Sequence, residues 1–420
     1  MFKDTLEKLR LTRDELQLIQ QSFSDEIALG LKGQSSCLGC FNTHVYLPIV
    51  HDASHFLAID LGGTNLRVAF CERLDNRVDV ISFRKEMVPV KLMSGEVSPL
   101  FDFVVTVVND CMGDFFITDT VKVGFTFSFR VDQESKKDAI IKQWNKGYKL
   151  KVDFDPVSEL TDAFIRAGLT HLSIDCLLND TTATLLANYF VYPQCDIGLI
   201  LGTGTNMCLA VPKRLLGTDL FSADQEKLIF NLESGNFNVN LPRLAIDELL
   251  DEGSLNPGVQ LQEKMVSGLY LGELASLLCL DYFDEKDYIS EWKKDDFLSS
   301  GLVGQFQSAD NHDISTHFKQ LLGIDLNQDD VDIIKSICIL VTKRSAQIAA
   351  ASIAGAIWYL DPKARDQHVI GIDGSLYTDH PHYQDYFEEA VFDLLPEFIP
   401  VLRFSSVEQA SLVGTALAIE

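Results

Sequence analysis

Two stretches of the chain share one hydrophobic pattern, in which an apolar run, a short polar turn and a second apolar run follow one another. They are Phe56 to Phe70 (FLAIDLGGTNLRVAF) and Ile197 to Val211 (IGLILGTGTNMCLAV). The polar turns consist of Asp60, Gly62, Gly63, Thr64 and Asn65 in the first stretch and of Gly202, Thr203, Gly204, Thr205 and Asn206 in the second. This pattern predicts two strand–turn–strand units.

Each turn has the composition of a phosphate-binding loop. Adjacent glycines tolerate positive φ and let backbone N–H groups reach a ligand without a Cβ in the way, and Thr and Asn add short polar side chains. For either turn alone, a plain hairpin turn is the alternative interpretation. Because the second turn repeats the Gly-Thr-Asn ending of the first, we expect a phosphoryl donor to bind between the two.

The rest of the pattern alternates between strands and helices. In the first half, strands are predicted over Val78–Val88, Val121–Phe127 and Leu172–Leu178, and helices over residues 1–30, Phe101–Met112, Pro156–Gly168 and the stretch after Asp180. In the second half, helices are predicted over Gln262–Leu278, Asp313–Leu322, Asp330–Leu360, Phe387–Leu395 and the C-terminal residues, and strands over Val369–Tyr377, ending in a glycine turn, and Val401–Phe404. Residues 30–40 and 130–149 are predicted as loops. This order favours two α/β halves facing one another across a cleft, with chain crossings near Asp180 and Ser405.

Composition excludes several classes of function. Acidic residues outnumber basic ones 61 to 35, for a net charge of −26, and no stripe gathers the Lys and Arg residues. Nucleic acid and anionic membranes are therefore poor partners. The amphipathic N-terminal pattern is not a signal peptide, and the longest apolar stretch, Ala349 to Leu360, is about half of the ~20 residues that span a bilayer. We expect a globular cytoplasmic protein.

The cysteines and histidines indicate neither a disulfide framework nor a metal site. Nine cysteines are scattered over 420 residues, a pattern typical of reduced core thiols. Cys37 and Cys40 form a CxxC, but no second pair accompanies it, and HExxH is absent. We expect no catalytic metal held by these residues.

Two side chains are candidates for the chemistry itself. Asp180 follows a predicted strand and precedes a helix, which is where open α/β sheets bind ligands. It could accept a proton from an attacking hydroxyl or merely cap the helix. Lys146, in the WNKGY stretch, is either a solvated lysine or a cation for a transferring phosphoryl group, with Mg²⁺ supplying further positive charge.

Two glutamates are weaker candidates. Glu233 lies in NLESGNF and Glu263 in NPGVQLQEKMVSG. Carboxylates that hydrogen-bond several hydroxyls suit a sugar site, because a buried polar group left unpaired costs roughly 1–3 kcal/mol. Without further support, surface charge is the simpler interpretation, above all for Glu263 beside Lys264.

Taken together, the motifs resemble the eukaryotic-type hexokinase and glucokinase family, within the sugar kinase, heat-shock and actin-like superfamily. Eight motifs occur in the family's order over nearly the whole chain: LAIDLGGTNLRV, GFTFSF, WNKGY, LNDTTATLLA, LGTGTN, NLESGNF, NPGVQLQEKMVSGLYLGE and GIDGSLY followed by His380-Pro381. The resemblance implies a two-lobed actin-like ATPase (ribonuclease H-like) fold, with a mixed sheet flanked by helices in each lobe and a deep interlobe cleft. It implies a small domain of residues 56–180 plus 406–420 and a large domain of residues 1–55 plus 181–405.

The resemblance also assigns roles to individual residues. It implies that the hexose is surrounded by Ser128, Asn145, Lys146, Asn179, Asp180, Asn206, Glu233 and Glu263. Asp180 would be the general base on the sugar's 6-hydroxyl, and Lys146 would stabilise the transferring phosphoryl group. The nucleotide site would comprise Asp60, Gly62, Gly63, Thr64, Asn65, Gly202, Thr203, Gly204, Thr205, Gly374 and Ser375. ATP and Mg²⁺ are the implied cofactors.

The chain departs from the family pattern at several positions. Asn145 replaces a usual Thr, Arg130 a usual Pro and Ser234 a usual Trp, and SSVEQASLVGTALA keeps only Gly414 of the glycines before the last helix. The change at Asn145 could alter which hexose fits, and the change in the SSVEQASLVGTALA segment concerns the adenine contacts. We therefore carry two hypotheses, an ATP-dependent hexose kinase and a catalytically inactive hexose-binding regulatory protein on the same scaffold.

Overall fold

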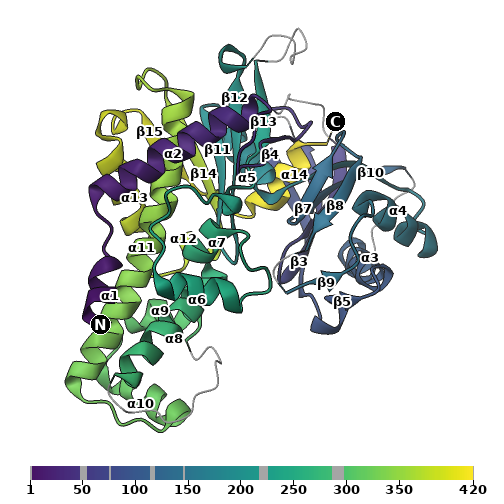
Figure 1. Cartoon of the computed structure of the whole chain (residues 1–420). Helices are drawn as coiled ribbons and strands as arrows, with labels where there is room; N and C mark the ends of the chain where they lie inside the picture. The colour runs from purple at the N-terminus through teal and green to yellow at the C-terminus, as the bar shows by residue number, and fades with distance from the viewer. Residues whose placement is uncertain are drawn as a thin grey trace.

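The computed structural model describes residues 2–47, 54–74, 77–113, 119–144, 147–216, 226–285 and 298–419, which form two lobes (Figure 1). The smaller lobe has a five-stranded sheet in the order β10-β6-β2-β3-β4. Its strands are β2 (Ser54–Leu61), β3 (Asn65–Leu74), β4 (Arg77–Met87), β6 (Val121–Phe127) and β10 (Leu172–Leu178). Strands β2, β3 and β4 are antiparallel, and β6 runs parallel to β2 and β10. Helix α3 (Ser98–Met112) packs on β3 and β4, and α4 (Pro156–Arg166) packs on β10.

The larger lobe has a six-stranded sheet in the order β1-β13-β12-β11-β14-β15. Its strands are β1 (Phe41–Asn42), β11 (Cys195–Leu201), β12 (Thr205–Pro212), β13 (Lys227–Asn231), β14 (His368–Asp373) and β15 (Leu402–Ser405). Its helices are α1 (Phe2–Lys8), α2 (Arg13–Leu31), α6 (Ala245–Gly253), α7 (Leu261–Val266), α8 (Gly268–Asp284), α9 (Ser300–Phe306), α10 (Asn311–Leu322), α11 (Gln328–Leu360), α12 (Ser375–Thr378) and α13 (Tyr383–Leu394). Strands β11 and β12 form an antiparallel hairpin, as β2 and β3 do. Both predicted strand–turn–strand units are therefore confirmed.

Shorter elements complete the described chain. They are η1 (Val90–Leu92), β5 (Ser94–Gly95), β7 (Arg130–Gln133), β8 (Ala139–Gln143), β9 (Lys149–Leu150), η2 (Lys213–Leu215), η4 (Ser234–Asn236) and η5 (Pro396–Phe398).

Two helices join the lobes. Helix α5 (Asp180–Val191) packs on β11 and β14 of the larger sheet, and α14 (Ala410–Leu417) packs on β2, β3 and β6 of the smaller sheet. The two helices also pack on each other, and at Gly414 an added Cβ would lie 1.8 Å from the carbonyl oxygen of Ala183. Gly414 is thus an interior residue of α14 that allows close helix packing, and not part of the preceding turn as expected.

Helix α11 is the core helix of the larger lobe. It has 33 residues and, by length and composition alone, could cross a membrane, although the expectation from uninterrupted apolar stretches was that no segment could. However, 83% of its most apolar window is buried inside the protein. It packs against α2, α8 and α13, so its apolar residues are accounted for by contacts within the lobe.

Four predicted elements differ from the structure. The strand and glycine turn predicted over Val369–Tyr377 are β14, which ends at Asp373, followed by helix α12. Residues 1–30 form α1 and α2, because Thr12 and Glu15 make a capping box that starts a new helix. The predicted loop 130–149 contains the hairpin β7–β8, in which buried Ala139 and Ile141 alternate with exposed residues. The predicted helix Gln262–Leu278 is α7 and α8, since Ser267 between them is extended.

The cysteines match their prediction. All nine are free thiols, and all but Cys37 are buried. Within the described ranges no group of three or more His, Cys, Asp or Glu side chains is placed to hold a metal ion.

Candidate functional site

A cleft of about 650 Å³ lies between the lobes, and we call it the interlobe cleft. Both glycine turns line it, as do all three aspartates that end or follow a strand near it. Its lining residues are Asp60, Gly62, Gly63, Thr64, Asn65, Arg67, Phe83, Lys85, Ser128, Asp180, Ile200, Gly202, Thr203, Gly204, Asp373, Gly374, Ser375, Thr378, Asp379, Glu408, Gln409 and Ser411. The fold therefore brings the two predicted phosphate loops and the predicted base to one cavity.

Backbone hydrogen bonds fix the shape of both turns. In the first, the Gly62 N–H donates to the Asn65 carbonyl at 3.0 Å; in the second, the Gly202 N–H donates to the Gly204 carbonyl at 3.0 Å. The N-terminus of α8 also donates to the second turn, from Gly268 to the Gly202 carbonyl at 2.9 Å. Turns whose carbonyls are already bonded inside the protein present a preorganised backbone to a ligand.

Gly374 must be glycine for the second turn to sit where it does. Its φ is 120°, and an added Cβ would lie 2.3 Å from the Leu201 carbonyl oxygen. Gly202 in turn lies against Gly374, with an added Cβ 3.4 Å from the Gly374 Cα. This contact joins the end of β14 to the second turn, so Gly374 and Ser375 line the same cleft.

One buried network connects the first turn to the C-terminal helix. Asp60, at the end of β2, accepts a hydrogen bond from the Ser411 hydroxyl at 2.7 Å and lies 3.6 Å from the Arg67 guanidinium. Arg67 Nη1 also donates to the Ser411 hydroxyl at 3.3 Å. Burial raises the pKa of Asp60, and Arg67 and Ser411 only partly oppose that rise.

Asp373, at the end of β14, lies in a similar environment. Burial raises the pKa of Asp373, while the Arg67 charge and the Gly374 N–H act in the opposite direction and the Asp180 charge raises it further. Four aspartates and Glu408 line the cleft, whereas Arg67 and Lys85 are the basic residues among its described lining. Such a cleft carries excess negative charge and favours a cation or a proton.

A second, narrower cavity of about 30 Å³ adjoins the cleft, and we call it the floor pocket. It is lined by Ser128, Phe129, Arg130, Asn179, Asp180, Ile200, Gly204, Thr205, Asn206, Glu233, Gly235, Gln260 and Glu263. Ser128, Asp180, Ile200 and Gly204 line both cavities. The six predicted sugar residues that the structure describes therefore gather here: Ser128, Asn179, Asp180, Asn206, Glu233 and Glu263.

Hydrogen bonds hold the polar side chains of the floor pocket in place. The Asn206 amide donates to the side-chain oxygens of Asn179 at 3.3 Å and Asn231 at 2.9 Å. Asn231 donates to Glu233 at 2.8 Å, and Glu263 accepts from the Thr205 N–H at 3.0 Å. Glu233 and Gln260 also have left-handed backbones, at φ 49° and 54°. Strained, interlocked polar residues of this kind are typical of binding sites.

Asp180 is the first residue of α5, and the helix cap is its neighbour. The Asn179 side chain accepts from the Thr181 N–H at 3.0 Å and is the N-cap. Asp180 Oδ1 also accepts from that N–H, at 2.9 Å. Capping therefore does not depend on Asp180, which lines both cavities.

One predicted site residue lies in a different cavity from the one expected, and two others lie outside the described part of the chain. Thr205, predicted in the second phosphate loop, lines the floor pocket and not the interlobe cleft, because it is already the first residue of β12. Asn145 and Lys146 lie outside the described residues.

Sequence reasoning missed several residues of the site. Arg67, Asp373, Ser411, Gln260 and Asn231 were not singled out. Asp373 carries a signal that could have found it, since it ends a strand before a glycine, as Asp60 does two residues before Gly62. Arg67 and Ser411 carry no such signal, because they are 344 residues apart and meet only in the fold.

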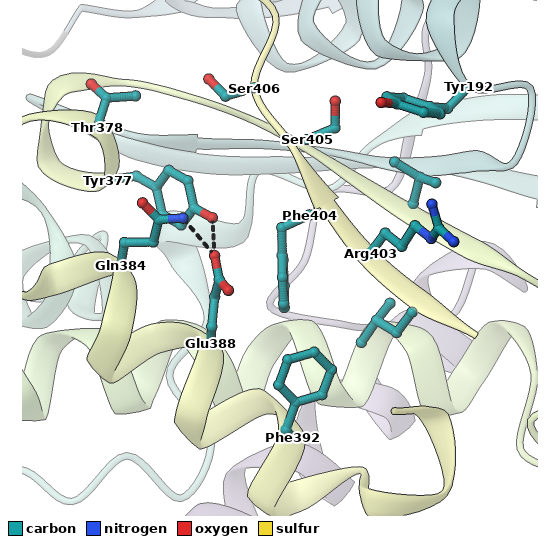
Figure 2. Close-up of a pocket in the computed structure, with 12 residues that line it drawn as sticks. Tyr192, Tyr377, Thr378, Gln384, Glu388, Phe392, Arg403, Phe404, Ser405 and Ser406 are labelled. Carbon is teal, nitrogen blue, oxygen red and sulfur yellow. Dashed lines mark hydrogen bonds between the residues drawn. The ribbon is translucent and has the colours of Figure 1, made fainter. Parts of the chain in front are cut away.

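A separate cavity of about 620 Å³ runs along the outer strand β15, and we call it the edge cavity (Figure 2). Tyr377 and Gln384 both donate to Glu388 there, at 2.6 and 2.8 Å, and Phe392, Arg403 and Phe404 line it (Figure 2). It shares Thr378 with the interlobe cleft and no residue with the floor pocket. The edge cavity is therefore not part of the floor-pocket site.

Known proteins resemble this chain along its whole length. Family profiles described as hexokinase match residues 1–190 and 196–420. Human Hexokinase-1 is 30% identical over 443 residues, and human Hexokinase HKDC1 is 32% identical over 439. These matches cover 99% and 97% of this chain but 47% and 46% of the relatives. The chain thus spans about half the length of the curated relatives it matches.

Solved structures agree with that result. A hexokinase from Schistosoma mansoni, complexed with glucose, superposes with a TM-score of 0.88 at 26% identity, covering 99% of this chain and 97% of that one. A ROK family glucokinase from Streptomyces griseus shares the fold at a TM-score of 0.53 and 16% identity, with 87% of this chain and 99% of that one covered. The fold is the two-lobed actin-like ATPase fold, and the chain belongs to the hexokinase family.

Proposed function

We propose that this chain is an ATP-dependent hexose kinase that transfers the γ-phosphoryl group to the 6-hydroxyl of a hexose, D-glucose in the first instance, and releases ADP and hexose 6-phosphate. The observation that carries the proposal is that Asp180 lines both the floor pocket and the interlobe cleft. A sugar in the first cavity and a triphosphate in the second would meet at this carboxylate. Glucose is the natural first test, because the Schistosoma mansoni relative is complexed with it.

The floor pocket supplies binding groups for the sugar. Carboxylate oxygens of Glu233 and Glu263 accept hydrogen bonds from hydroxyls, and the amides of Asn179 and Asn206 both donate and accept. Because these side chains already bond one another or nearby backbone, they lose little freedom when sugar binds. Asp180 would then accept the proton of the attacking 6-hydroxyl.

The interlobe cleft supplies binding groups for the donor. Backbone N–H groups of the two glycine turns would bind the phosphate oxygens, and Arg67 adds a positive charge beside Asp60. Gly374 and Ser375 would bind the nucleoside end. Lys146 stays a prediction as the cation on the transferring group. Closure of the lobes would exclude water from the phosphoryl group.

Mg²⁺ fits the cleft as a partner of the nucleotide. Magnesium is usually bound by one or two carboxylates together with substrate phosphates and waters, and this suits a cleft whose described carboxylates form no three-ligand metal site. Asp60 and Asp373, with their raised pKa values, are the carboxylates that a nearby cation would stabilise. Bound there, the ion would neutralise charge on the β- and γ-phosphates.

Replacing the base tests the proposal. In Asp180→Ala we expect hexose-dependent ADP release to fall roughly 10²–10⁴-fold, the usual contribution of a general base, while glucose binding by calorimetry persists. Asp132→Ala, which removes an exposed carboxylate from β7, is the matched control and should keep wild-type turnover. Unfolding of both variants is followed in parallel, so that loss of the fold is not mistaken for loss of the base.

The rival hypothesis is a hexose-binding regulatory protein without turnover. It is motivated by the altered segment before α14, where the family's glycines are missing. If glucose, mannose and fructose all bind to the wild-type protein, yet neither they nor a 2-substituted hexose releases ADP from Mg-ATP, this second hypothesis is favoured and the kinase proposal fails. Equal turnover in wild type and Asp180→Ala would also contradict the kinase mechanism.

A further inference from the structure

A third cavity, of about 540 Å³, lies beyond the floor pocket, and we call it the loop cavity. Residues 30–41, 236–238 and 258–261 form its walls, with polar side chains from Gln34, Ser35, Asn236 and Asn238 and one aromatic ring, Phe41. It shares Arg130 and Gln260 with the floor pocket. None of its lining residues belongs to the interlobe cleft.

The shared residues place the three cavities in a fixed order. The interlobe cleft meets the floor pocket at Asp180 and Ser128, and the floor pocket meets the loop cavity at Arg130 and Gln260. A hexose in the floor pocket with its 6-hydroxyl at Asp180 therefore turns its opposite end toward Arg130 and Gln260. In a pyranose ring the atom opposite carbon 5, which bears the 6-hydroxymethyl group, is carbon 2. A substituent on carbon 2 would point into the loop cavity.

Arg130 lacks the partner that a buried donor normally has. Its Nε atom is buried and has no hydrogen-bond acceptor among the residues that the structure describes. Its guanidinium carbon lies 5.9 Å from the centre of the Phe41 ring, which positions it at the wall of the loop cavity. Because an unpaired buried donor costs free energy, an acceptor supplied by a ligand is favoured here. Arg130 also stands where the hexokinase pattern has Pro, which has no such donor.

We propose that the acceptor substrate of this chain is a 2-acylamino-2-deoxyhexose, such as N-acetylglucosamine. Its acyl group occupies the loop cavity, and its carbonyl oxygen accepts a hydrogen bond from Arg130. Asn236, Asn238 and Gln34 offer further amide partners. A site built to bond such an oxygen discriminates against an analogue that lacks it, because its own donor is then left unpaired. The inference rests on the proposed kinase function, since it uses the orientation that Asp180 imposes.

The direct test compares sugars in the wild-type protein with Mg-ATP. We expect kcat/KM for N-acetylglucosamine to exceed that for glucose by roughly tenfold or more, the effect of one hydrogen bond from a charged donor. Binding of the same two sugars without nucleotide, measured by calorimetry, should show the same order. A wild-type protein that binds and phosphorylates glucose but not N-acetylglucosamine would overturn the proposal.

Two variants separate the loop cavity from the rest of the site. Arg130→Met keeps the length of the side chain but removes the donor, and Ser35→Trp fills the cavity from an exposed loop position. In each, kcat/KM for N-acetylglucosamine should fall roughly tenfold more than that for glucose. Arg403→Met, in the edge cavity, is the matched control and should leave the ratio of the two sugars as it is in wild type.

The outcomes distinguish this inference from the proposed function. If N-acetylglucosamine binds and both variants weaken that binding, but no sugar is phosphorylated, the loop cavity is confirmed as a binding site and the kinase proposal fails. If hexoses are phosphorylated and neither variant changes the ratio of the two sugars, the kinase proposal stands and the role of the loop cavity is refuted. If Arg130→Met does not fold, the ratio of kcat/KM for the two sugars in Ser35→Trp tests the role of the loop cavity by itself.

Discussion

A charge cluster lies at each end of strands β11 and β14, and the two clusters differ in how completely their charges are paired. At the amino ends lie Asp196, Lys227, Asp361 and His368, which we call the sheet-end cluster. At the carboxyl ends lie Asp373 and, across the cleft, Asp60, Arg67 and Asp180, which we call the cleft cluster. One charge cluster thus lies at the end of the larger sheet that is far from the glycine turns, and the other lies beside those turns and draws on both lobes.

The sheet-end cluster pairs its charges closely. His368 bonds Asp196 through Nδ1 at 2.8 Å and Asp361 through Nε2 at 3.4 Å, and Lys227 bonds Asp196. Asp361 further accepts from the backbone N–H groups of residues 363, 365 and 366. In the cleft cluster the Arg67–Asp60 distance is 3.6 Å, and the pKa values of Asp60 and Asp373 are both raised by burial. The first cluster stabilises the fold, while the second leaves negative charge available for ligand chemistry.

The largest expected effect comes from breaking the helix contact on which the cleft cluster depends. In Gly414→Ala the new Cβ would meet the backbone of Ala183, which cannot move as a side chain can. Helix propensity favours Ala by about 1 kcal/mol, but overpacking of this kind typically costs about 1–3 kcal/mol or more. We expect a net loss of stability in urea unfolding together with loss of turnover, because α5 carries Asp180 and α14 carries Ser411.

Gly253→Ala is the control for that substitution. Gly253 ends α6, and an added Cβ there meets nothing within 4 Å. The variant should be as stable as wild type or slightly more stable, with unchanged turnover. If Gly414→Ala behaves in the same way, the close packing of α5 on α14 does not matter for the site.

A smaller effect is expected at the sheet-end cluster, and it depends on pH. Burial alone would lower the pKa of His368, but its hydrogen bonds to Asp196 and Asp361 and their charges more than offset this, so the pKa is raised. The stabilisation is therefore fully present below the unfolded pKa, about 6.5, and is lost as pH rises through the folded value. In His368→Gln we expect a loss of about 1–3 kcal/mol at acid pH, shrinking as pH increases.

Urea unfolding at several pH values measures that difference, with His312→Gln as an exposed histidine control. Sugar turnover should be unchanged in His368→Gln, because the sheet-end cluster lies at the far ends of β11 and β14 from the cleft. A stability difference that grows with pH would contradict the raised pKa of His368. A specific loss of turnover would show that the two clusters are not separate in function.

The smallest expected effect is at Asp373, where a substitution should increase stability and not reduce it. Because the pKa of Asp373 is raised, its ionised form is less favourable in the folded protein than in the unfolded chain. Asp373→Asn should therefore increase the free energy of unfolding at neutral pH, by less than about 1 kcal/mol for a partly exposed charge. The gain should disappear below about pH 4, where the carboxyl group is protonated in both states.

The same substitution should reduce turnover while it stabilises the protein. Such a trade-off is expected where a site is kept charged for function. Asp379→Asn, which changes an exposed carboxylate at the same end of the cleft, is the matched control for stability. If Asp373→Asn is less stable than wild type at pH 7, the Asp373 carboxylate stabilises the fold and is not part of an excess of negative charge in the cleft.

Short-range features of the sequence account for the local elements of this protein. Both glycine hairpins, the strands Val121–Phe127 and Leu172–Leu178, and the aspartate that begins α5 after β10 follow from short-range hydrophobic pattern and turn chemistry. The family motifs also placed six described polar residues around one pocket. The domain boundaries at residues 56, 180 and 405 stay predictions, as do the roles of Asn145 and Lys146.

The distant residues that complete the site are brought together by the packing of the two lobes and could not be identified from local pattern. Ser411 bonds Asp60 from 351 positions away, and the charge of Arg67 acts on both Asp60 and Asp373. Gly414 was predicted to be a turn residue, but it allows the close packing of α14 on α5. Arg130 lines the loop cavity, which no sequence motif predicted. The physical reason is that periodicity reports which face of an element is buried, whereas the partner across that face depends on how sheets and helices pack over hundreds of residues.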